Sequence, residues 1–109
     1  MATTYKVLGQ VAPSATTNTD LYTVGAGKSA VVSTIAITNR AGTSATYRVA
    51  IRTGGAAISN EDYIAYDATV TANNSTFITI GVTLAATDVI TVYGSTANLS
   101  FNAFGSEIS

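Results

Sequence analysis

The feature that most constrains the fold is an alternation of apolar with small or charged side chains over residues 31–52. In the second half of this segment, "ATYRVAIR", the apolar positions are Tyr47, Val49 and Ile51. Successive side chains of a β-strand point to opposite faces of the sheet, whereas a helix repeats every 3.6 residues. The alternation therefore predicts strands with one buried face, and we expect Tyr47, Val49 and Ile51 to point inward.

The same period recurs along the chain, and turn-forming residues interrupt it roughly every 8–12 residues. No window keeps apolar residues at helical spacing for three turns, so we expect almost no helix. The short turns between the later strands favour antiparallel neighbours. The prediction is an all-β antiparallel β-sandwich of about eight strands, jelly-roll-like, that forms a single domain over residues 1–109. The expected strands lie at residues 5–11, 21–24, 31–38, 47–52, 62–70, 77–84, 89–95 and 99–104.

Unbroken alternation also assigns side chains to faces. Residues 31–38 are fairly apolar on both faces, which predicts a central strand. The turn that follows contains Gly42, which can adopt a positive φ. We expect each of these sets to share one face: Tyr5, Val7 and Val11; Val31, Ser33, Ile35 and Ile37; Ile78, Ile80, Val82 and Leu84; and Ser100, Asn102 and Phe104, opposite Leu99, Phe101 and Ala103.

Charged residues are scarce. They make up 10% of the chain, against roughly 25% in an average soluble domain, while hydrophobic residues make up 47%, enough for a packed core. The formal net charge of -1 argues against a nucleic-acid partner, which needs a basic patch, and against binding to anionic membranes. A weak net charge removes the repulsion that keeps molecules apart, so the composition favours a component of an assembly.

The sequence carries no recognisable signal for export or for a membrane span. The segment "MATTYKVLGQ" has no basic stretch followed by an apolar run. No stretch approaches the roughly 20 apolar residues that a membrane-spanning helix needs. We expect synthesis and folding in a cytoplasm, wherever the protein then works.

Catalytic residues are difficult to assemble from this composition. The chain has neither His nor Cys, so the commonest general base, the most nucleophilic side chain and the usual zinc ligands are missing. Glu61 and Asp62 are adjacent and the other carboxylates are scattered, which leaves a glycosidase pair or a calcium site as minor alternatives. Asp20 and Asp88 stand at strand starts, where Asp commonly accepts hydrogen bonds from backbone amides. We expect no enzyme, no cofactor and no metal.

The segment "VGAGKS" (residues 24–29) resembles the end of a phosphate-binding loop. The full motif needs Gly where Tyr22 stands and a helix afterwards, whereas a strand pattern follows here. We expect a tight turn with Lys28 in solvent.

Four residues are candidates for an interface. Arg48 and Arg52 share the outward face of one strand. There they can pair with carboxylates of a neighbouring subunit, or stay in solvent and discourage edge pairing. Tyr63 and Tyr66 are expected on opposite faces, so at least one of them should reach the surface or an interface. The loop at residues 53–63 is a candidate for glycan contact.

Most of the chain resembles small virion structural proteins of tailed bacteriophages, which are common among phages of marine bacteria, including those infecting cyanobacteria. The resemblance rests on "ATTYKVLGQVAPSATTNTDLYTVGAGKSAVVSTIAITNR", on "ATYRVAI", on "YIAYD" and on "DVITVYGSTANLSFNAFGSEI". Such proteins often carry Pro in a "TVPAGK" turn, where this chain has Gly25. The resemblance implies a virion component and transfers no catalytic residues.

Two functions follow from this resemblance. The first is a capsid decoration or cement protein that binds the outer shell as a homo-oligomer, expected to be a trimer, with the major capsid protein as partner. The alternative is a fibre, tail or baseplate module that contacts a host-surface glycan. Outward Ser, Thr and Ala suit either, because they give flat faces that pack against other subunits. Copy number per particle separates the two, since a shell carries far more decoration proteins than tail parts.

Overall fold

The computed structural model describes residues 2–109. In this part of the chain 59% of residues lie in strands and 6% in helices, so the predicted all-β class is confirmed. The helices are single 3-10 turns, η1 (Thr53–Gly55) and η2 (Asn60–Asp62). The nine strands of the described residues are β1 (Thr3–Val11), β2 (Thr19–Thr23), β3 (Ser29–Asn39), β4 (Ala45–Arg52), β5 (Tyr63–Val70), β6 (Ser75–Ile78), β7 (Val82–Leu84), β8 (Val89–Gly94) and β9 (Leu99–Ile108).

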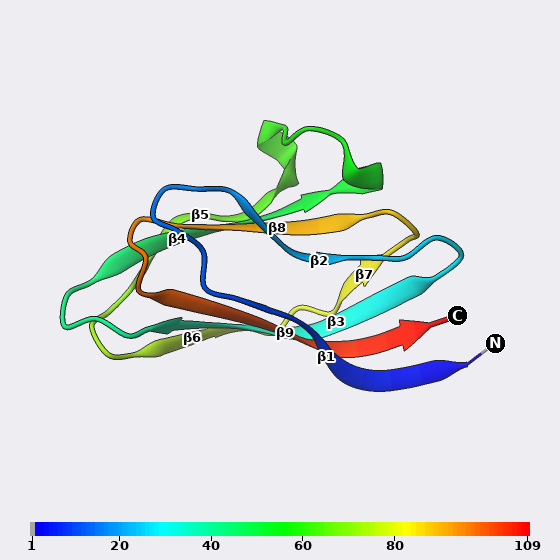
Figure 1. Ribbon diagram of the computed structural model, residues 1–109, viewed down its shortest axis with the longest axis horizontal. Helices are drawn as coiled ribbons and strands as arrows, with labels where there is room; N and C mark the ends of the chain where they lie inside the picture. Colours follow the sequence, from blue (N-terminus) through cyan, green and yellow to red (C-terminus); the bar gives the residue numbers. More distant parts are fainter. Residues whose placement is uncertain (1) are drawn as a thin grey trace.

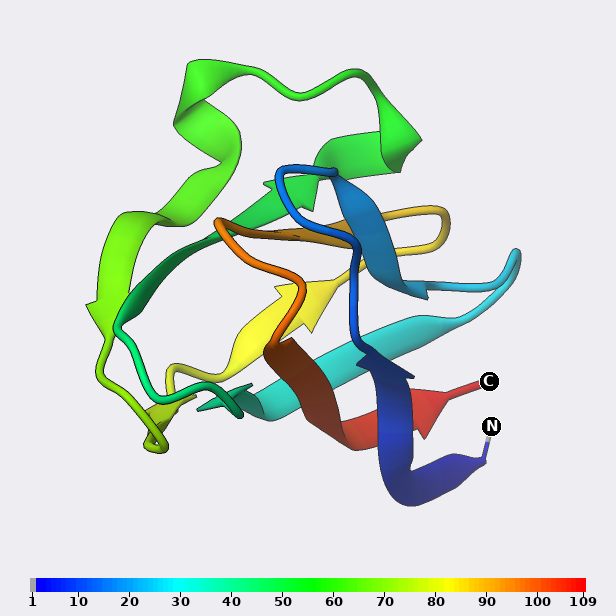
Figure 2. The same ribbon diagram turned by 60° about the vertical axis from the view of Figure 1, so that its left-hand side comes forward.

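The strands form two antiparallel sheets that lie face to face, as Figures 1 and 2 show. One sheet has five strands in the order β1-β9-β3-β6, with β7 also paired to β3, and the other has the order β2-β8-β4-β5. If β6 and β7 are taken as one interrupted strand, β1 pairs with β9, β2 with β8, β3 with β6 and β7, and β4 with β5. This nested pairing across two sheets is the jelly-roll topology that the sequence predicts.

The core lies between the two sheets and is filled by the inward side chains of the strands. Phe101 of β9 and Ile37 of β3 are fully buried there. Tyr47 and Val49 of β4 are also buried and Ile51 packs against the core, so the predicted inward face of this strand is confirmed. The strand β3 pairs with β9 on one side and with β6 and β7 on the other, which confirms its central position.

Two β-bulges at the same level of the five-stranded sheet overturn the face assignment of β1 and β3. Leu8 is an extra residue in the pairing of β1 with β9, and Ser33 is an extra residue in the pairing of β3 with β9. One inserted residue reverses the faces of all residues beyond it. Tyr5 and Val7 are therefore exposed, whereas Val11 packs against the core.

The same reversal separates Val31 from the residues expected beside it. Ile35 and Ile37 are buried in the core, and on the other side of the bulge the buried residues are Ala30 and Val32. Val31 lies between these two in sequence and therefore points outward, with Ser106 as its partner in β9.

The single strand expected at residues 77–84 is wrong, because β6 and β7 replace it. The chain leaves the ladder between them, opposite the bulge of β3, where Gly81 has a φ of 62°. Ile78 and Val82 pack against the core as expected. Ile80 does not share their face and is 58% exposed.

The two ends of the described chain lie side by side (Figure 1). The amide of Ala2 donates to the carbonyl of Ser109 over 2.8 Å, and the amide of Ser109 donates to the carbonyl of Ala2 over 2.9 Å. These bonds extend the ladder between β1 and β9 to its last residues.

Two glycines allow the backbone to pass close to a neighbouring strand. A Cβ atom at Gly9 would lie 2.0 Å from the carbonyl oxygen of Leu21, and one at Gly105 would lie 2.0 Å from the carbonyl oxygen of Val31. Both glycines adjoin the level of the bulges, so the bulged geometry excludes a side chain at either position.

We predict that Gly105→Ala lowers the free energy of unfolding by at least about 1–3 kcal/mol, because the added methyl group forces β9 away from β3. Gly42→Ala is the matched control. Gly42 does not adopt the positive φ that the turn pattern allowed, and nothing lies within 4 Å of its Cβ position. Urea unfolding of both variants checks the prediction, and equal stabilities would contradict it.

Candidate assembly interface

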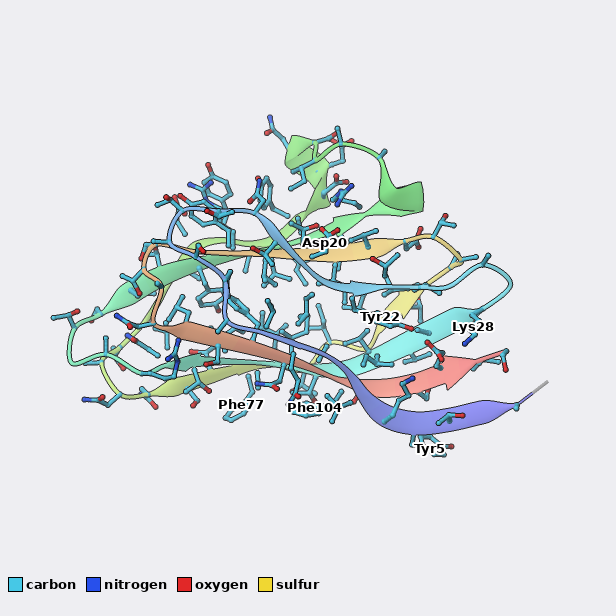
Figure 3. All side chains as sticks on the ribbon, in the orientation of Figure 1. Tyr5, Asp20, Tyr22, Lys28, Phe77 and Phe104 are labelled. Atoms are coloured by element: carbon cyan, nitrogen blue, oxygen red, sulfur yellow. The ribbon has the colours of Figure 1, made fainter. Side chains whose placement is uncertain are left out.

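Large apolar side chains stand in solvent on the outside of the five-stranded sheet. Tyr5 is 85% exposed, Phe77 is 65% exposed and Phe104 is 37% exposed. Figure 3 shows all three pointing away from the other sheet. We call this surface, made by the outward side chains of β1, β9, β3 and β6 and including Val7 and Ala36, the apolar face.

Cross-strand pairing joins these side chains into one surface. Val7 is the partner of Phe104 across β1 and β9, and Ala36 is the partner of Phe77 across β3 and β6. Directly opposed residues of antiparallel strands lie on the same side of the sheet and touch. The polar members of the face are uncharged, such as Gln10 and Asn102, whose amides share a 2.7 Å hydrogen bond.

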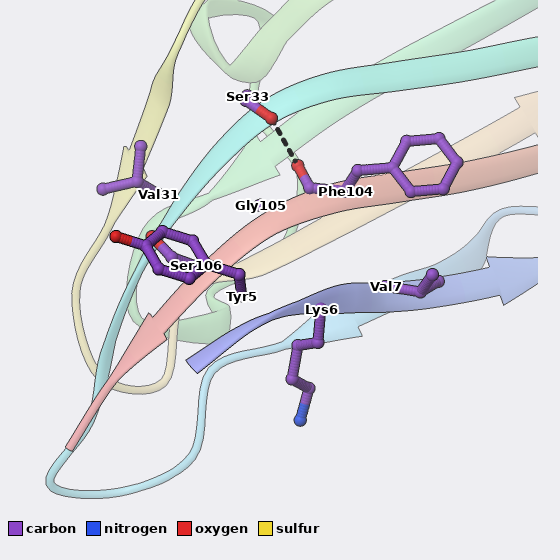
Figure 4. A pocket seen from close by; sticks show the side chains of 8 residues that line it. All are labelled: Tyr5, Lys6, Val7, Val31, Ser33, Phe104, Gly105 and Ser106. Atoms are coloured by element: carbon purple, nitrogen blue, oxygen red, sulfur yellow. Dashed lines mark hydrogen bonds between the residues drawn. The ribbon is translucent and has the colours of Figure 1, made fainter. Parts of the chain in front are cut away.

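A hollow of about 510 Å³ opens on the apolar face (Figure 4), and the residues that line it are Tyr5, Lys6, Val7, Val31, Ser33, Phe104, Gly105 and Ser106. The bulge forms its floor, where the hydroxyl of Ser33 donates to the carbonyl of Phe104 over 3.1 Å. The hollow is open and mostly apolar, so its shape suits an inserted hydrophobic side chain.

No charged side chain lies on the apolar face among the described residues. In the five strands of this sheet only Lys6 and Glu107 are charged, and both turn toward the other sheet. Glu107 is only 15% exposed; it accepts a 2.7 Å hydrogen bond from the hydroxyl of Tyr22 in β2. The ammonium groups of Lys28 and Lys6 lie 3.4 and 3.6 Å from its other oxygen. Lys28 remains exposed, as predicted, and its ammonium group also pairs with Glu107.

This cluster sets the protonation of its members. The hydrogen bond from Tyr22, helped by Lys28 and Lys6, lowers the pKa of Glu107 although partial burial opposes it. Burial, the hydrogen bond to Glu107 and its negative charge raise the pKa of Tyr22. A carboxylate and a neutral phenol are therefore the stable forms, and together they tie β2 to β9 at the end of the sandwich.

The outside of the four-stranded sheet is different, because it carries charges in pairs. Arg48 donates to the two oxygens of Asp67 over 2.7 and 3.3 Å. Its guanidinium also lies 4.3 Å from the ring centroids of Tyr66 and of Tyr93. The hydrogen bonds from Arg48 lower the pKa of Asp67, so the pair stays ionised.

Arg52 is held in the same way by its own chain. It donates to Asp20 over 3.0 Å and to the carbonyls of Gly55 and Ala56 over 2.7 and 2.8 Å. Asp20 also accepts from the hydroxyl of Thr91, so it binds side chains and not the backbone amides that its position suggested. Both guanidinium groups thus have intramolecular partners, and pairing with a neighbouring subunit stays a prediction.

Tyr63 and Tyr66 do not fall on opposite faces. Extra residues in β5 interrupt its pairing with β4, and Asp67 adopts a φ of 51° there. Their rings consequently meet edge to face with centroids 4.8 Å apart. With Asn60 they line a hollow of about 270 Å³. Tyr66 is 58% exposed, so the prediction that one of the two reaches the surface is confirmed.

The other chemical motifs have structural roles. The segment at residues 24–29 is a turn followed by β3, so no helix follows it to hold phosphate. Asp88 accepts from the backbone amides of Gly54 and Ala85, as predicted. Asp62 closes a capping box at η2 with Ser59. Within residues 2–109 no three metal-ligating acidic side chains come together.

Sequence reasoning missed the apolar face. Tyr5 and Val7 were expected to share a face with Val11, because nothing in the pattern reveals the bulge at Leu8. A signal existed for Phe104, a large aromatic at an outward position otherwise held by Ser100 and Asn102.

Comparison with protein families and with curated proteins gives no match for this chain. None of the helices in the described part of the chain is long and apolar enough to cross a membrane.

The cluster at Glu107 makes a pH-dependent stability testable. The folded-state pKa of Glu107 is below its ordinary value of 4.5. The ionised carboxylate therefore contributes its full stabilisation of the folded state at pH values above 4.5. The contribution is lost as the pH falls through the lowered pKa. We predict that Glu107→Gln is less stable than the parent at about pH 7 and loses less stability between about pH 6 and pH 3. Urea unfolding at several pH values checks this, with Asp67 titrating equally in both proteins. Parallel losses would contradict it.

Proposed function

We propose that this chain is a structural protein of a bacteriophage virion, a decoration or cement protein that binds the outside of the capsid shell as a homo-oligomer. The observation that carries the proposal is the difference between the two outer sheet faces. One presents Tyr5, Phe77 and Phe104 without a charge, while the other holds Arg48 and Arg52 in ion pairs. A face of the first kind is suited to being covered.

The free energy favours covering this face. Burial of a large apolar side chain contributes about 1.5–3 kcal/mol, and no charged group of the face has to be dehydrated with it. Exposed apolar patches on soluble proteins generally mark interaction sites. Side chains such as Thr34 and Ser100 complete the face with hydroxyls that pack closely or hydrogen-bond across subunits.

The proposed mechanism is mass action. A protein that binds only the assembled shell stabilises the assembled state against bursting, in proportion to its occupancy. The major capsid protein is the proposed partner on the shell, and the protein reaches its site after synthesis in the host cytoplasm. The proposal assigns no catalytic step to the chain.

The test is the copy number on the particle. We expect quantitative gel densitometry and mass spectrometry of purified particles of the phage that encodes the chain to find hundreds of copies, on the order of the major capsid protein. A number in the low tens would favour a tail or fibre component instead, and absence from the particle would refute the virion role.

A second experiment tests the apolar face itself. Phe77→Lys places a charge on the face at a residue that is 65% exposed, so folding is retained. We expect its occupancy on particles lacking the native protein to fall at least about tenfold. Ile64→Lys, on β5 of the other sheet and 40% exposed, is the matched control and should bind normally. Equal binding by both variants would show that the face is not used.

The hollow beside Tyr63 and Tyr66 favours a second candidate, a tail or fibre module that contacts a host glycan. Exposed aromatic rings stack on sugars, and Asn60 offers amide groups for sugar hydroxyls. If so, Tyr66→Ala should weaken binding to polysaccharide extracted from the host surface by about 3–10-fold. Phe77→Ala is the control, and no loss with Tyr66→Ala would exclude this site.

A further inference from the structure

We infer that the apolar face binds the same face of a second copy of this chain, giving a two-fold dimer in which the five-stranded sheets lie back to back. The inference rests on the proposed function, because it names the surface that builds the homo-oligomer. The inference also goes beyond the proposed function, because it names another copy of the chain, and not the shell, as the occupant of the apolar face.

The size of the face is the first reason. The face is four strands wide, at about 4.8 Å per strand, and ten residues of β9 at about 3.3 Å each give its length, so the patch measures roughly 19 by 33 Å. Stable interfaces bury about 800 Å² on each partner, and this patch with its upright aromatic side chains approaches that area. One sheet face therefore offers most of the area that a stable dimer buries on each partner.

The charges are the second reason. A hetero-partner is usually selected through charge complementarity, and this face offers none, since Lys6 and Glu107 turn inward. Two copies of an uncharged face meet without repulsion. The net charge of -1 per chain adds almost no repulsion between the two copies.

The third reason is the position of the hollow relative to Phe77. The hollow lies toward β1, between Tyr5, Val7 and Phe104, whereas Phe77 stands on β6 at the opposite edge of the sheet. If one copy is turned over about an axis that runs along the strands, its β6 comes to lie over β1 of the other copy. The register places Phe77 level with Ala36, Asn102 and Gln10 across the sheet, so Phe77 of each copy then lies over Gln10 of the other, next to Val7 at the rim of the hollow.

Such a contact is made twice by the two-fold axis, so the face is complementary to itself. Stacked sheets pack about 10 Å apart with their strands within about 30° of alignment, and this spacing leaves room for the aromatic side chains of both copies. The trimer expected from the sequence remains a prediction, and a mass measurement separates it from this dimer.

Sedimentation velocity of the purified chain over a range of concentrations is the first part of the test. We expect a species of twice the 11.1 kDa chain mass. Phe77→Lys and Tyr5→Lys should each raise the dissociation constant at least about tenfold, and Ile64→Lys should leave it unchanged. A monomer at every concentration, a trimer, or a dimer that only Ile64→Lys disrupts would each overturn the inference.

Cross-linking is the second part and tests the orientation. The chain contains no Cys, so single-Cys variants form disulfides only where they are placed. An oxidised mixture of Gln10→Cys and Phe77→Cys should give a mixed disulfide dimer, and Ile64→Cys mixed with either should not. Cross-linking through Ile64→Cys alone would overturn the proposed face.

The failure of the dimer and the failure of the virion role give different results. If the chain is monomeric but Phe77→Lys loses occupancy on particles, the shell covers the face and the dimer is refuted while the virion role stands. If the dimer forms but particles never contain the chain, the dimer stands and the virion role is refuted.

Discussion

The two bulges that flank β9 are the constraint on which the rest of the structure depends. Leu8 and Ser33 each insert one residue at the same level of the five-stranded sheet, and each insertion exchanges inside for outside beyond it. Without the bulge in β1, Tyr5 would enter the core and Lys6 would stand on the sheet surface. A one-residue irregularity thus decides which side chains of the first strand meet solvent and which meet Glu107.

The two sheets differ in where their charged side chains lie. The four-stranded sheet holds Arg48 and Arg52 in ion pairs with carboxylates of the same chain. Its outer surface therefore carries charges that are polar and solvated but already paired. The five-stranded sheet sends its only two charges to the end of the sandwich, where they also tie the sheets together. A chain with few ionised residues thereby produces one surface that water solvates well and another that it solvates poorly.

The sequence was sufficient for the fold class, the sandwich and the inward face of β4, because these follow from the period of the hydrophobic pattern and from turn spacing. The jelly-roll order was expected too, but hydrophobic period and turn spacing do not determine which strands pair. The sequence was insufficient wherever one residue leaves a ladder. Tyr63 and Tyr66 were expected on opposite faces, and Ile80 was expected on the same face as Ile78. Both expectations follow from an alternation that continues in the amino-acid sequence, whereas the backbone leaves the regular strand geometry there. The ion pairs could not be predicted either, because Asp20 of β2 and Arg52 of β4 meet only across the strand between them, β8. Phe104 alone among the residues of the apolar face could have been recognised from its polar neighbours.

The adjacent chain ends have a practical consequence for engineering. Because the backbones of Ala2 and Ser109 are hydrogen-bonded to each other, a peptide appended to either one emerges at the same corner of the sandwich. A short linker between them would close the polypeptide into a ring, which could then be reopened at a surface loop to move both attachment points elsewhere. Cargo could thus be relocated around the sandwich without altering the order of strands in either sheet.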